Sequence, residues 1–534
     1  MDTDCTFINY KDTNSFSELV YDYIENAKTL QPFYAFTADK KGIEAAIDAR
    51  KNTAVNRPVL VEVLQEQYAS TDAPDAVLAN IQSLLDPNTY TICTAHQPNL
   101  LTGYLYFFYK ILHAIKMAVV LKTEHPELNF VPVYYMGSED NDLEELGQFW
   151  HQGQKYTWDA AGQTGAVGRM NTKSLALVLE KLFAYFGPPG EYCSALIETL
   201  SAAYLKQTTI AAATQYLVNS LFGHYGLVVL NPDNKKLKKL FAPIIMDELL
   251  HQKAYPIVHK QSALLAQNYT VQAFPRPINL FYLKDDMRAR IEKQADKWVV
   301  LQSPIAFSEK EIIDEVNQHP DRFSPNVILR GLFQETILPN ICFIGGGSEL
   351  AYWLQLKPLF DHYNIFYPSL FLRQSVQIIS PKSQELLQQT GFHAKDIFDT
   401  ENNLIKRMLL QKIGPSWDLS AEAQSIESNF VELAARAKHL DASLEKTAAA
   451  SITKIKKQLK NLEQKMYRAE KKKEAISIDQ IIRLKAACQP NGIVQERIEN
   501  FSDYYLQYGW RIFDEIKWHL RPFGNQFMII STLQ

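Results

Sequence analysis

The chain has 534 residues, of which 46% are hydrophobic and 21% charged, and its net charge is −4. This length exceeds one compact core, and the charge gives no overall attraction to nucleic acid. No apolar run reaches the roughly 18 residues of a membrane span, and the N-terminus lacks a secretory signal. The five cysteines are scattered without a C-x-x-C pair, which favours a reducing cytoplasm over disulfides or a zinc knuckle.

Helical periodicity dominates residues 1–90, and a different rhythm follows. Short apolar runs rich in β-branched and aromatic residues alternate with helical stretches at 103–124, 233–252, 330–338 and 348–363. The runs read YTICTA, NFVPVYYMG, YGLVVLNP, NVILRG, NICFIGG and VQIISP. This alternation predicts an α/β fold with a parallel sheet covered on both faces. Ligands of such folds bind beyond the carboxyl ends of the strands.

Two stretches interrupt the alternation. We expect an inserted helical subdomain at 143–222 and a second, smaller insertion at about 253–325. The predicted domains are a core at 1–142 with a helical N-terminal part, its continuation at 223–395, an antiparallel helical coiled coil at 396–500, and a segment at 501–534 that returns to the core. Within this last segment, FMIIST is predicted to be a strand of the main sheet.

Heptad spacing marks residues 426–469. Apolar residues recur there at steps of three and four, with one stutter at KTAAAS. A helix of roughly 45 residues would be about 65 Å long and must pair with another helix. The partner is either a neighbouring chain or the return segment SIDQIIRLKAACQP. The lysine-rich stretch 454–473 is expected to be a solvated flank, with an anionic-ligand or nucleic-acid site as the alternative.

Polar side chains follow the first predicted strand of the sheet. His96 and Gln97 come directly after it, Thr102 and Gly103 form a turn, and Tyr106 lies on the next helix. A helix that begins here would direct backbone N–H groups toward an anion such as a phosphate or carboxylate. The usual P-loop and dinucleotide-binding patterns are absent from the sequence. His96 either orients a phosphate or acts as an acid or base; the alternative is a structural turn residue.

A second polar group, Ser138, Glu139, Asp140 and Asp142, follows the next strand. Such groups bind an amine or a metal, or accept a proton from a nucleophile. The alternative is a helix N-terminus in which serine or aspartate is the cap. That alternative explains the glutamates after Asp142 better than it explains residues 138–140.

A third group lies within residues 324–360. Arg330 is expected to close a strand, Gln334 lies on a helix, and a glycine run opens another helix. Glycines allow the backbone to approach a ligand closely, and an arginine suits a carboxylate. The candidate residues of the run and the following helix face are Gly345, Gly346, Gly347, Glu349, Tyr352 and Trp353. Trp353 has a second interpretation as a core residue.

Together these motifs resemble the BshC family, the cysteine-adding enzymes of bacillithiol biosynthesis. The resemblance rests on HQPNLLTGYLY, PVYYMGSEDNDLEE, RFSPNVILRGLFQETILPN, GGGSELAYWLQLKPLF and NGIVQERIENF, in order over nearly the whole chain. It implies a Rossmann-like core with connecting-peptide insertions, as in class I aminoacyl-tRNA synthetases, and a coiled coil that makes a homodimer. It also implies a ligase that joins the carboxyl group of L-cysteine to the amine of glucosaminyl malate. Family members often have histidine where Asn141 stands.

Amide formation from a free carboxylate needs activation, either adenylation by ATP or phosphorylation. We hypothesise that His96, Gln97 and the turn at 102–103 hold the activated group. Glu139 and Asp140 would bind the incoming amine and take its proton. Arg330 and Arg373 would bind the malate carboxylates.

The other substrate-binding candidates are Tyr106, Ser138, Asp142, Gln334, Gly345, Gly346, Gly347, Glu349, Tyr352 and Trp353. No Cys/His cluster of ligand spacing predicts a metal for the thiol, and no nucleic-acid or membrane partner is expected. Two alternatives remain open at this point. One is an adenylate-forming transferase with another amine acceptor, and the other is a catalytically inactive coiled-coil scaffold.

Overall fold

A computed structural model describes residues 3–188, 190–415 and 417–532. The chain divides into two compact units. Unit 1 comprises Met1–Gln377 and Val494–Ile530, and unit 2 comprises Ile378–Ile493 and Ser531–Gln534. Among the described residues, no helix has the length and apolar character needed to cross a membrane.

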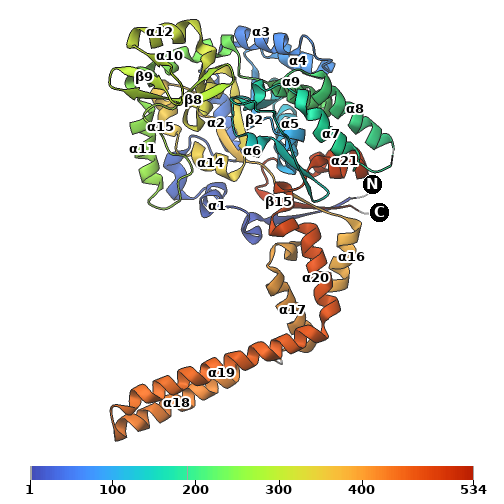
Figure 1. Ribbon diagram of the computed structural model, residues 1–534, viewed down its shortest axis with the longest axis vertical. Helices are drawn as coiled ribbons and strands as arrows, with labels where there is room; N and C mark the ends of the chain where they lie inside the picture. The colour runs from blue at the N-terminus through green and yellow to red at the C-terminus, as the bar shows by residue number, and fades with distance from the viewer. Residues whose placement is uncertain (1–2, 189, 416, 533–534) are drawn as a thin grey trace. The chain divides into compact units, whose positions relative to one another are not determined.

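A five-stranded parallel sheet forms the centre of unit 1 (Figure 1). Its strands, in the order β13-β12-β2-β3-β6, are β13 (Ser369–Leu372), β12 (Asn340–Gly345), β2 (Thr89–His96), β3 (Asn129–Met136) and β6 (Val228–Leu230). Nearly every residue of these strands is buried. The predicted Rossmann-like parallel sheet is therefore confirmed, and its near-continuous apolar strands reflect burial on both faces.

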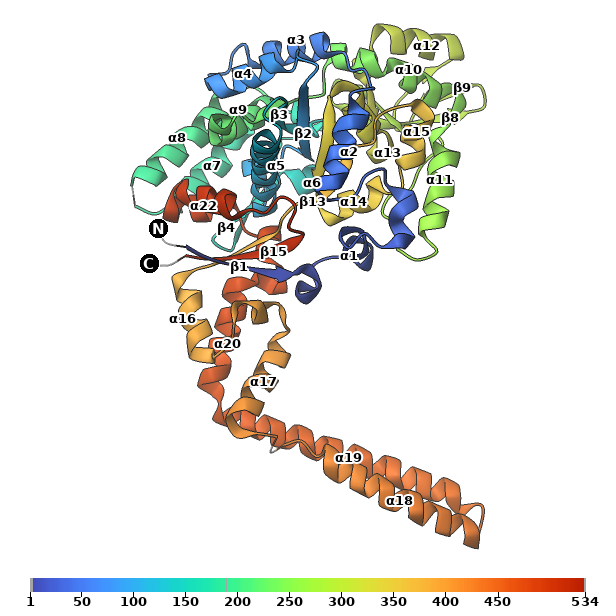
Figure 2. The ribbon, with the colours of Figure 1, turned by 180° about the vertical axis from the view of Figure 1, so that it is seen from behind.

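The strand order creates a crevice. α5 (Leu105–Glu124) carries the chain from β2 to β3, whereas α14 (Gly347–Trp353) and α15 (Lys357–Tyr363) carry it from β12 to β13, in the opposite direction across the sheet. Because crossovers are right-handed, these helices cover opposite faces. Figure 2 shows α5 beside α2 (Lys40–Arg50) over the strands. The carboxyl ends of β2 and β12 therefore meet at a switch point, where ligands of such sheets bind.

The prediction that NVILRG is a strand is wrong. These residues open α13 (Val327–Ile337), which follows the short strand β11 (Phe323–Pro325). The side chain of Asn326 caps the helix by accepting a hydrogen bond from the backbone N–H of Ile328 at 2.9 Å. An apolar run of this length fits either a buried strand or a buried helix, and the cap decides here.

The expected place of the last strand is also wrong. β15 (Gln526–Thr532) is a strand, but it pairs with β1 (Thr3–Asn9) and β14 (Val376–Ile379) in a separate three-stranded sheet of order β1-β15-β14. β14 corresponds to VQIISP, which therefore also lies outside the parallel sheet. Apolar alternation identifies a strand but does not specify its neighbours.

Both interruptions of the sheet contain secondary structure of their own. The first includes β4 (Gln148–His151), β5 (Gln154–Thr157), α7 (Ala176–Phe183), α8 (Glu191–Lys206) and α9 (Ile210–Phe222). The second contains an antiparallel sheet of order β10-β9-β8-β7-β11. Its other strands are β7 (Leu280–Lys284), β8 (Met287–Gln294), β9 (Lys297–Val300) and β10 (Ala306–Phe307), and α10 (Lys235–His251) precedes them.

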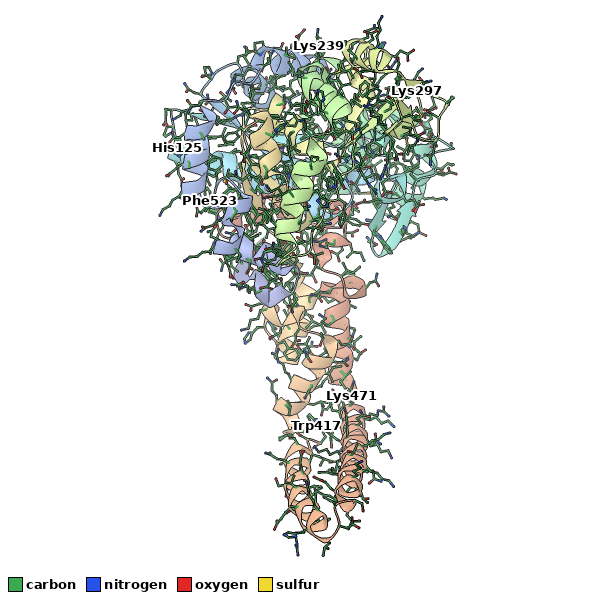
Figure 3. The ribbon with its side chains drawn as sticks, turned by 90° about the vertical axis from the view of Figure 1, so that its left-hand side faces the viewer. His125, Lys239, Lys297, Trp417, Lys471 and Phe523 are labelled. Atoms are coloured by element: carbon green, nitrogen blue, oxygen red, sulfur yellow. The ribbon has the colours of Figure 1, made fainter. Side chains whose placement is uncertain are left out.

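The C-terminal coiled coil of unit 2 is a helical hairpin. α18 (Ser420–Leu440) and α19 (Leu444–Lys473) pack antiparallel, and the open end of the hairpin carries Trp417 and Lys471 (Figure 3). The expected single long helix is thus wrong. The chain turns at 441–443, where the side chain of Asp441 accepts a hydrogen bond from the N–H of Ser443 at 2.8 Å. Heptad spacing continues through the turn because each helix places the same kind of apolar seam against the other.

Three shorter helices complete the described part of unit 2: α16 (Pro381–Thr390), α17 (Glu401–Ile413) and α20 (Ala475–Cys488). The return segment SIDQIIRLKAACQP forms most of α20, which packs against α16 and α17. α18 therefore pairs with α19 and not with this return segment.

Candidate functional site

A cavity of about 460 Å³ opens in unit 1 beyond the carboxyl ends of β2, β3 and β12. His96 lies at the end of β2, Glu139 and Asp140 follow β3, and Glu349 follows β12. The three polar segments singled out in the sequence therefore meet at one place. The other predicted residues that line the cavity are Gln97, Tyr106, Ser138, Arg330, Gly346, Gly347, Tyr352 and Arg373.

The imidazole of His96 is held neutral. Its ring meets the ring of Tyr106 edge-on at 5.3 Å, and its Nε2 atom is buried without a hydrogen-bond partner among the described residues. Burial lowers the pKa of His96 well below its usual value of 6.5, and the charges of Lys110, Arg373 and Arg330 lower it further. A histidine in this state is a poor proton donor at neutral pH, but it can accept a hydrogen bond.

Lys110 and Glu349 form a buried ion pair beside His96. Lys110 lies on α5, where its ammonium also donates to the carbonyl of Ala95 at 3.0 Å. Glu349 accepts the backbone N–H of Gly346 at 2.8 Å, so the same carboxylate oxygen caps α14. Burial lowers the pKa of Lys110 against the opposing effect of Glu349. The sequence signal of Lys110 was a lysine between apolar residues near the start of α5, a helix that also contains Lys116 and Lys122.

Arg373 is held by Glu496. The two side chains form a bidentate ion pair with both N–O distances at 2.7 Å, and both residues are almost fully buried. The guanidinium also lies 5.3 Å from the centre of the Tyr106 ring. Glu496 belongs to the 3-10 turn Gln495–Arg497, which returns to unit 1 after unit 2. The arginine expected to bind a substrate carboxylate is thus already neutralised by the protein.

Arg330 differs from Arg373 because it has no ion-pair partner within the described part of the chain. It is one turn into α13 and donates a hydrogen bond to the phenol of Tyr352. Its guanidinium lies 5.9 Å from the ring centre of Tyr135. A partly buried cation whose hydrogen-bond partner is neutral attracts an anionic group of a ligand.

At the end of β3 the two carboxylates differ. Glu139 forms an ion pair with Lys238 of α10, and its second oxygen accepts the hydroxyl of Ser324 at 3.0 Å. Asp140 is less buried and accepts hydrogen bonds from neutral groups, including the side-chain amide of Gln97 at 3.2 Å. Glu139 therefore has both oxygens occupied by protein, whereas Asp140 faces the cavity without a cationic partner among the described residues.

The side chains of Ser138 and Asp142 both form hydrogen bonds within the protein. The hydroxyl of Ser138 donates to the side-chain oxygen of Asn231 at 2.6 Å. Asp142 caps the short helix α6 (Leu143–Leu146) by accepting the N–H of Glu145 at 3.1 Å. The helix-cap interpretation therefore holds for Asp142, which lies outside the cavity lining.

Thr102 and Gly103 also lie outside the cavity lining. Residues 101–103 have positive φ angles of 48°, 63° and 71°, and the side-chain amide of Asn500 donates to the carbonyls of Leu101 and Gly103. The first N–H of α5, from Leu105, donates to the carbonyl of Glu499 at 2.9 Å. This helix N-terminus is thus capped by the protein.

The remaining predicted residues belong to the core. Trp353 packs against Phe343 with ring centres 4.9 Å apart, Gln334 is buried and donates to Glu335, and Gly345 ends β12. None of the three is part of the cavity lining formed by the described residues.

Arg288 and Arg497 line the cavity and were not recognised in the sequence. Arg288 comes from β8 of the second insertion, and Arg497 follows Glu496. Neither forms an ion pair with any residue that the structure describes. Both arginines lie among other polar residues in the sequence, so hydrophobic periodicity does not single them out. Among the described residues, no three His, Cys, Asp or Glu side chains lie close enough to hold a metal.

Two family models match nearly the whole chain. The model for the N-terminal Rossmann-like domain of bacillithiol biosynthesis BshC matches residues 1–374, and the model for its C-terminal coiled-coil domain matches residues 376–532. Similar proteins named "Putative cysteine ligase BshC" occur in several bacteria. The one from Flavobacterium johnsoniae is 37% identical over 99% of this chain and 100% of its own length. The one from Cytophaga hutchinsonii is 39% identical over 93% of this chain and 94% of its own length. The one from Christiangramia forsetii is 36% identical over 99% of this chain and 99% of its own length.

Proposed function

Because the chain belongs to the BshC family of bacillithiol biosynthesis, we propose that it joins the carboxyl group of L-cysteine to the amine of glucosaminyl malate, as the last step of that pathway. One observation carries the proposal. A single cavity combines a carboxylate without a cationic partner, Asp140, with the unpaired guanidinium groups of Arg330 and Arg288. A ligation between a carboxylic acid and an amine requires both kinds of group.

The carboxylic acid must first be activated, because a free carboxylate has no good leaving group that an amine could displace. Adenylation by ATP or phosphorylation would achieve this, and each introduces a phosphate whose charge needs compensation. Arg330 has four of its five N–H donors free for an anionic group, either this phosphate or a carboxylate, since one hydrogen bond to Tyr352 is its described polar contact. The neutral imidazole of His96, beside it, would accept a hydrogen bond from the activated acid or from the acceptor.

The amine must lose a proton before it attacks. Asp140 is the better base of the two carboxylates at the end of β3, because Glu139 is engaged by Lys238 and Ser324. Gln97 would orient Asp140 through the hydrogen bond at 3.2 Å. The proposal therefore assigns removal of the amine proton to Asp140 alone, whereas the sequence-based expectation gave it to Glu139 and Asp140 together.

The malate part of the acceptor is dianionic. Arg330 would bind one of its carboxylates directly, whereas Arg373, already paired with Glu496, would act by holding Tyr106 in place.

We further propose a homodimer formed by the α18–α19 hairpin in a cytoplasmic protein. No described residue of these two helices is buried, and apolar side chains along them are widely exposed, among them Val431 (64%), Leu433 (48%) and Leu462 (49%). A helical pair with an open apolar side gains free energy by packing against a second copy. Light scattering tests this: a dimer that becomes monomeric after Val431→Glu and Leu462→Glu supports it, and a monomeric parent protein contradicts it.

The deciding experiment incubates the purified protein with L-cysteine, glucosaminyl malate and each nucleoside triphosphate in turn, and identifies the products by mass spectrometry. Formation of bacillithiol supports the proposal. Consumption of a different amine would favour a generic adenylate-forming transferase. Absence of product with every nucleotide, for a protein that is folded by circular dichroism, would favour an inactive scaffold.

A further inference from the structure

Arg288 lines the cavity, but no step of the proposed reaction has yet been assigned to it. It lies on β8 of the second insertion, and it is the charged residue of the cavity lining that the antiparallel sheet of this insertion contributes. The residue is partly buried, and no residue that the structure describes forms an ion pair with it. Its positive charge therefore faces the cavity with no described carboxylate at ion-pair distance, and the protein compensates it only through the more distant Glu139 and Asp140.

Three contacts fix its guanidinium. Nη1 donates to the side-chain oxygen of Asn141 at 2.9 Å, Nε donates to the hydroxyl of Ser324 at 3.3 Å, and Cζ lies over the ring of Phe281, 3.9 Å from its centre. All three partners are neutral. They orient the arginine and leave its charge and its remaining N–H donors for a ligand.

The antiparallel sheet explains how these partners come together. Phe281 of β7 pairs with Ser324 of β11 on one side and with Arg290 of β8 on the other. Arg288 lies two residues from Arg290 and therefore on the same face of the sheet. From there its side chain crosses the ring of Phe281 to reach Ser324.

The orientation of Ser324 is set in turn by Glu139. The serine hydroxyl donates to the carboxylate of Glu139, so its lone pairs are available to the N–H of Arg288. Glu139 itself is neutralised by Lys238, which is fully buried and also donates to the carbonyl of Phe323 at 2.6 Å. The carboxylate next to Arg288 therefore orients its neighbours and forms its ion pair with Lys238 and not with the arginine.

We propose that Arg288 is a substrate-binding residue that takes an anionic oxygen group, a carboxylate or a phosphate, and that Glu139 and Ser324 are positioning residues for it. The list of candidate ligands, which are a carboxylate of L-cysteine, a carboxylate of glucosaminyl malate and a phosphate of ATP, rests on the proposed function. The presence of an anion site at Arg288 does not depend on the proposed function.

The test measures ligand binding by the full-length protein with isothermal titration calorimetry. The probes are L-cysteine, cysteamine (which lacks the carboxylate), glucosaminyl malate and ATP. Arg288→Gln should weaken the binding of one of the three anionic probes at least tenfold, because a charge-assisted hydrogen bond is lost. Arg288→Lys should recover part of this loss, and Ser324→Ala should weaken the same probe by a smaller factor.

Arg290→Gln is the matched control. Arg290 is exposed, lies on the same strand and face, and is 5.9 Å from the same ring of Phe281, but it is not part of the cavity lining. This variant should bind every probe within about twofold of the parent protein.

The identity of the affected probe names the group that Arg288 binds. The inference is overturned if Arg288→Gln binds all anionic probes as the parent does, if Arg290→Gln shows the same loss, or if the parent binds none of them. Bacillithiol formation is measured separately. Product formation with unchanged binding constants would overturn this inference alone, and a specific binding loss without any product would overturn the proposed ligase alone.

Discussion

Two regions of the cavity handle charge in opposite ways. In the sheet-edge region, formed by Lys110, Glu349, Arg373 and Glu496, each cation is paired with a carboxylate of the protein. In the insertion-side region, formed by Asp140 and Arg288, the charged groups have neutral hydrogen-bond partners. The comparison indicates that the first region holds the cavity in shape and that the second is left for a ligand, because an unpaired charge gains most from a new partner.

The largest effect is expected from breaking a pair of the sheet-edge region. Glu496→Ala leaves Arg373 as a buried cation without a counter-charge, which should lower the free energy of unfolding by about 3–5 kcal/mol. Chemical denaturation followed by tryptophan fluorescence measures the loss. The control is Glu427→Ala, which removes an exposed ion pair with Lys456 and should cost less than about 1 kcal/mol. Equal effects of the two variants would remove the distinction between the regions.

A substitution of Asp140 in the insertion-side region should lower the turnover number and leave stability nearly unchanged. Asp140→Asn removes the proposed base and should lower kcat about 100-fold or more, with little change in stability. Asp142→Asn is the matched control, because asparagine also caps a helix, and it should retain nearly full activity. Glu139→Gln should instead reduce stability by leaving Lys238 unpaired. A larger loss of kcat in a stable Glu139→Gln protein would reassign the base to Glu139.

Acid should weaken the sheet-edge region through His113 on α5. Its Nδ1 accepts the N–H of Gln374, next to Arg373, at 3.0 Å, and its Nε2 lies 3.1 Å from the carbonyl of Pro522. Burial lowers the pKa of His113 from 6.5 to about 4. The folded state therefore binds fewer protons than the unfolded state between these values, and stability that is complete above pH 6.5 is lost as the pH falls toward 4, by at most about 3 kcal/mol.

Thermal unfolding of the parent and of His113→Gln at a series of pH values measures this effect. The variant should be less stable at pH 7.5, and its midpoint should fall less steeply between pH 6.5 and 4. Parallel curves for the two proteins would show that His113 does not contribute to acid sensitivity.

The smallest effect tests how Asp140 is oriented. Gln97→Met keeps the approximate size of the side chain but removes the hydrogen bond to Asp140 at 3.2 Å. A single neutral donor contributes about 1 kcal/mol, so kcat should fall roughly fivefold with KM nearly unchanged. Steady-state kinetics measures both values. A loss as large as that of Asp140→Asn would mean that Gln97 contacts the substrate itself.

Much of the fold could be predicted from local pattern. β2, β3, β6 and β12 appear as apolar runs, and the helical stretches at 103–124 and 348–363 appear as periodic ones, because burial on both faces or on one stripe leaves a signature in neighbouring residues. β13 was missed because a strand of four residues, three of them apolar, is too short to show a pattern. α13 was misread because the signal for its start is the cap at Asn326.

The candidate site was predicted in part for the same reason. His96, Glu139 and Glu349 stand at strand ends, and parallel strands bring their carboxyl ends to one edge. The local sequence pattern could not reveal whether each of these groups is already engaged by another part of the protein. It placed Thr102 and Gly103 at a helix N-terminus but not the carbonyl of Glu499 that caps this helix.

The amino-acid sequence by itself determined the parallel sheet, the coiled-coil seam and the edge at which polar groups gather, since each depends on residues close together in the chain. Only the tertiary structure decided which charges are paired. Glu139 forms an ion pair with Lys238 across 99 residues and Arg373 with Glu496 across 123, whereas Arg288 forms no ion pair in the described chain. The physical reason is that an ion pair depends on distances of a few ångströms in space, and the fold sets these distances with no trace in local periodicity.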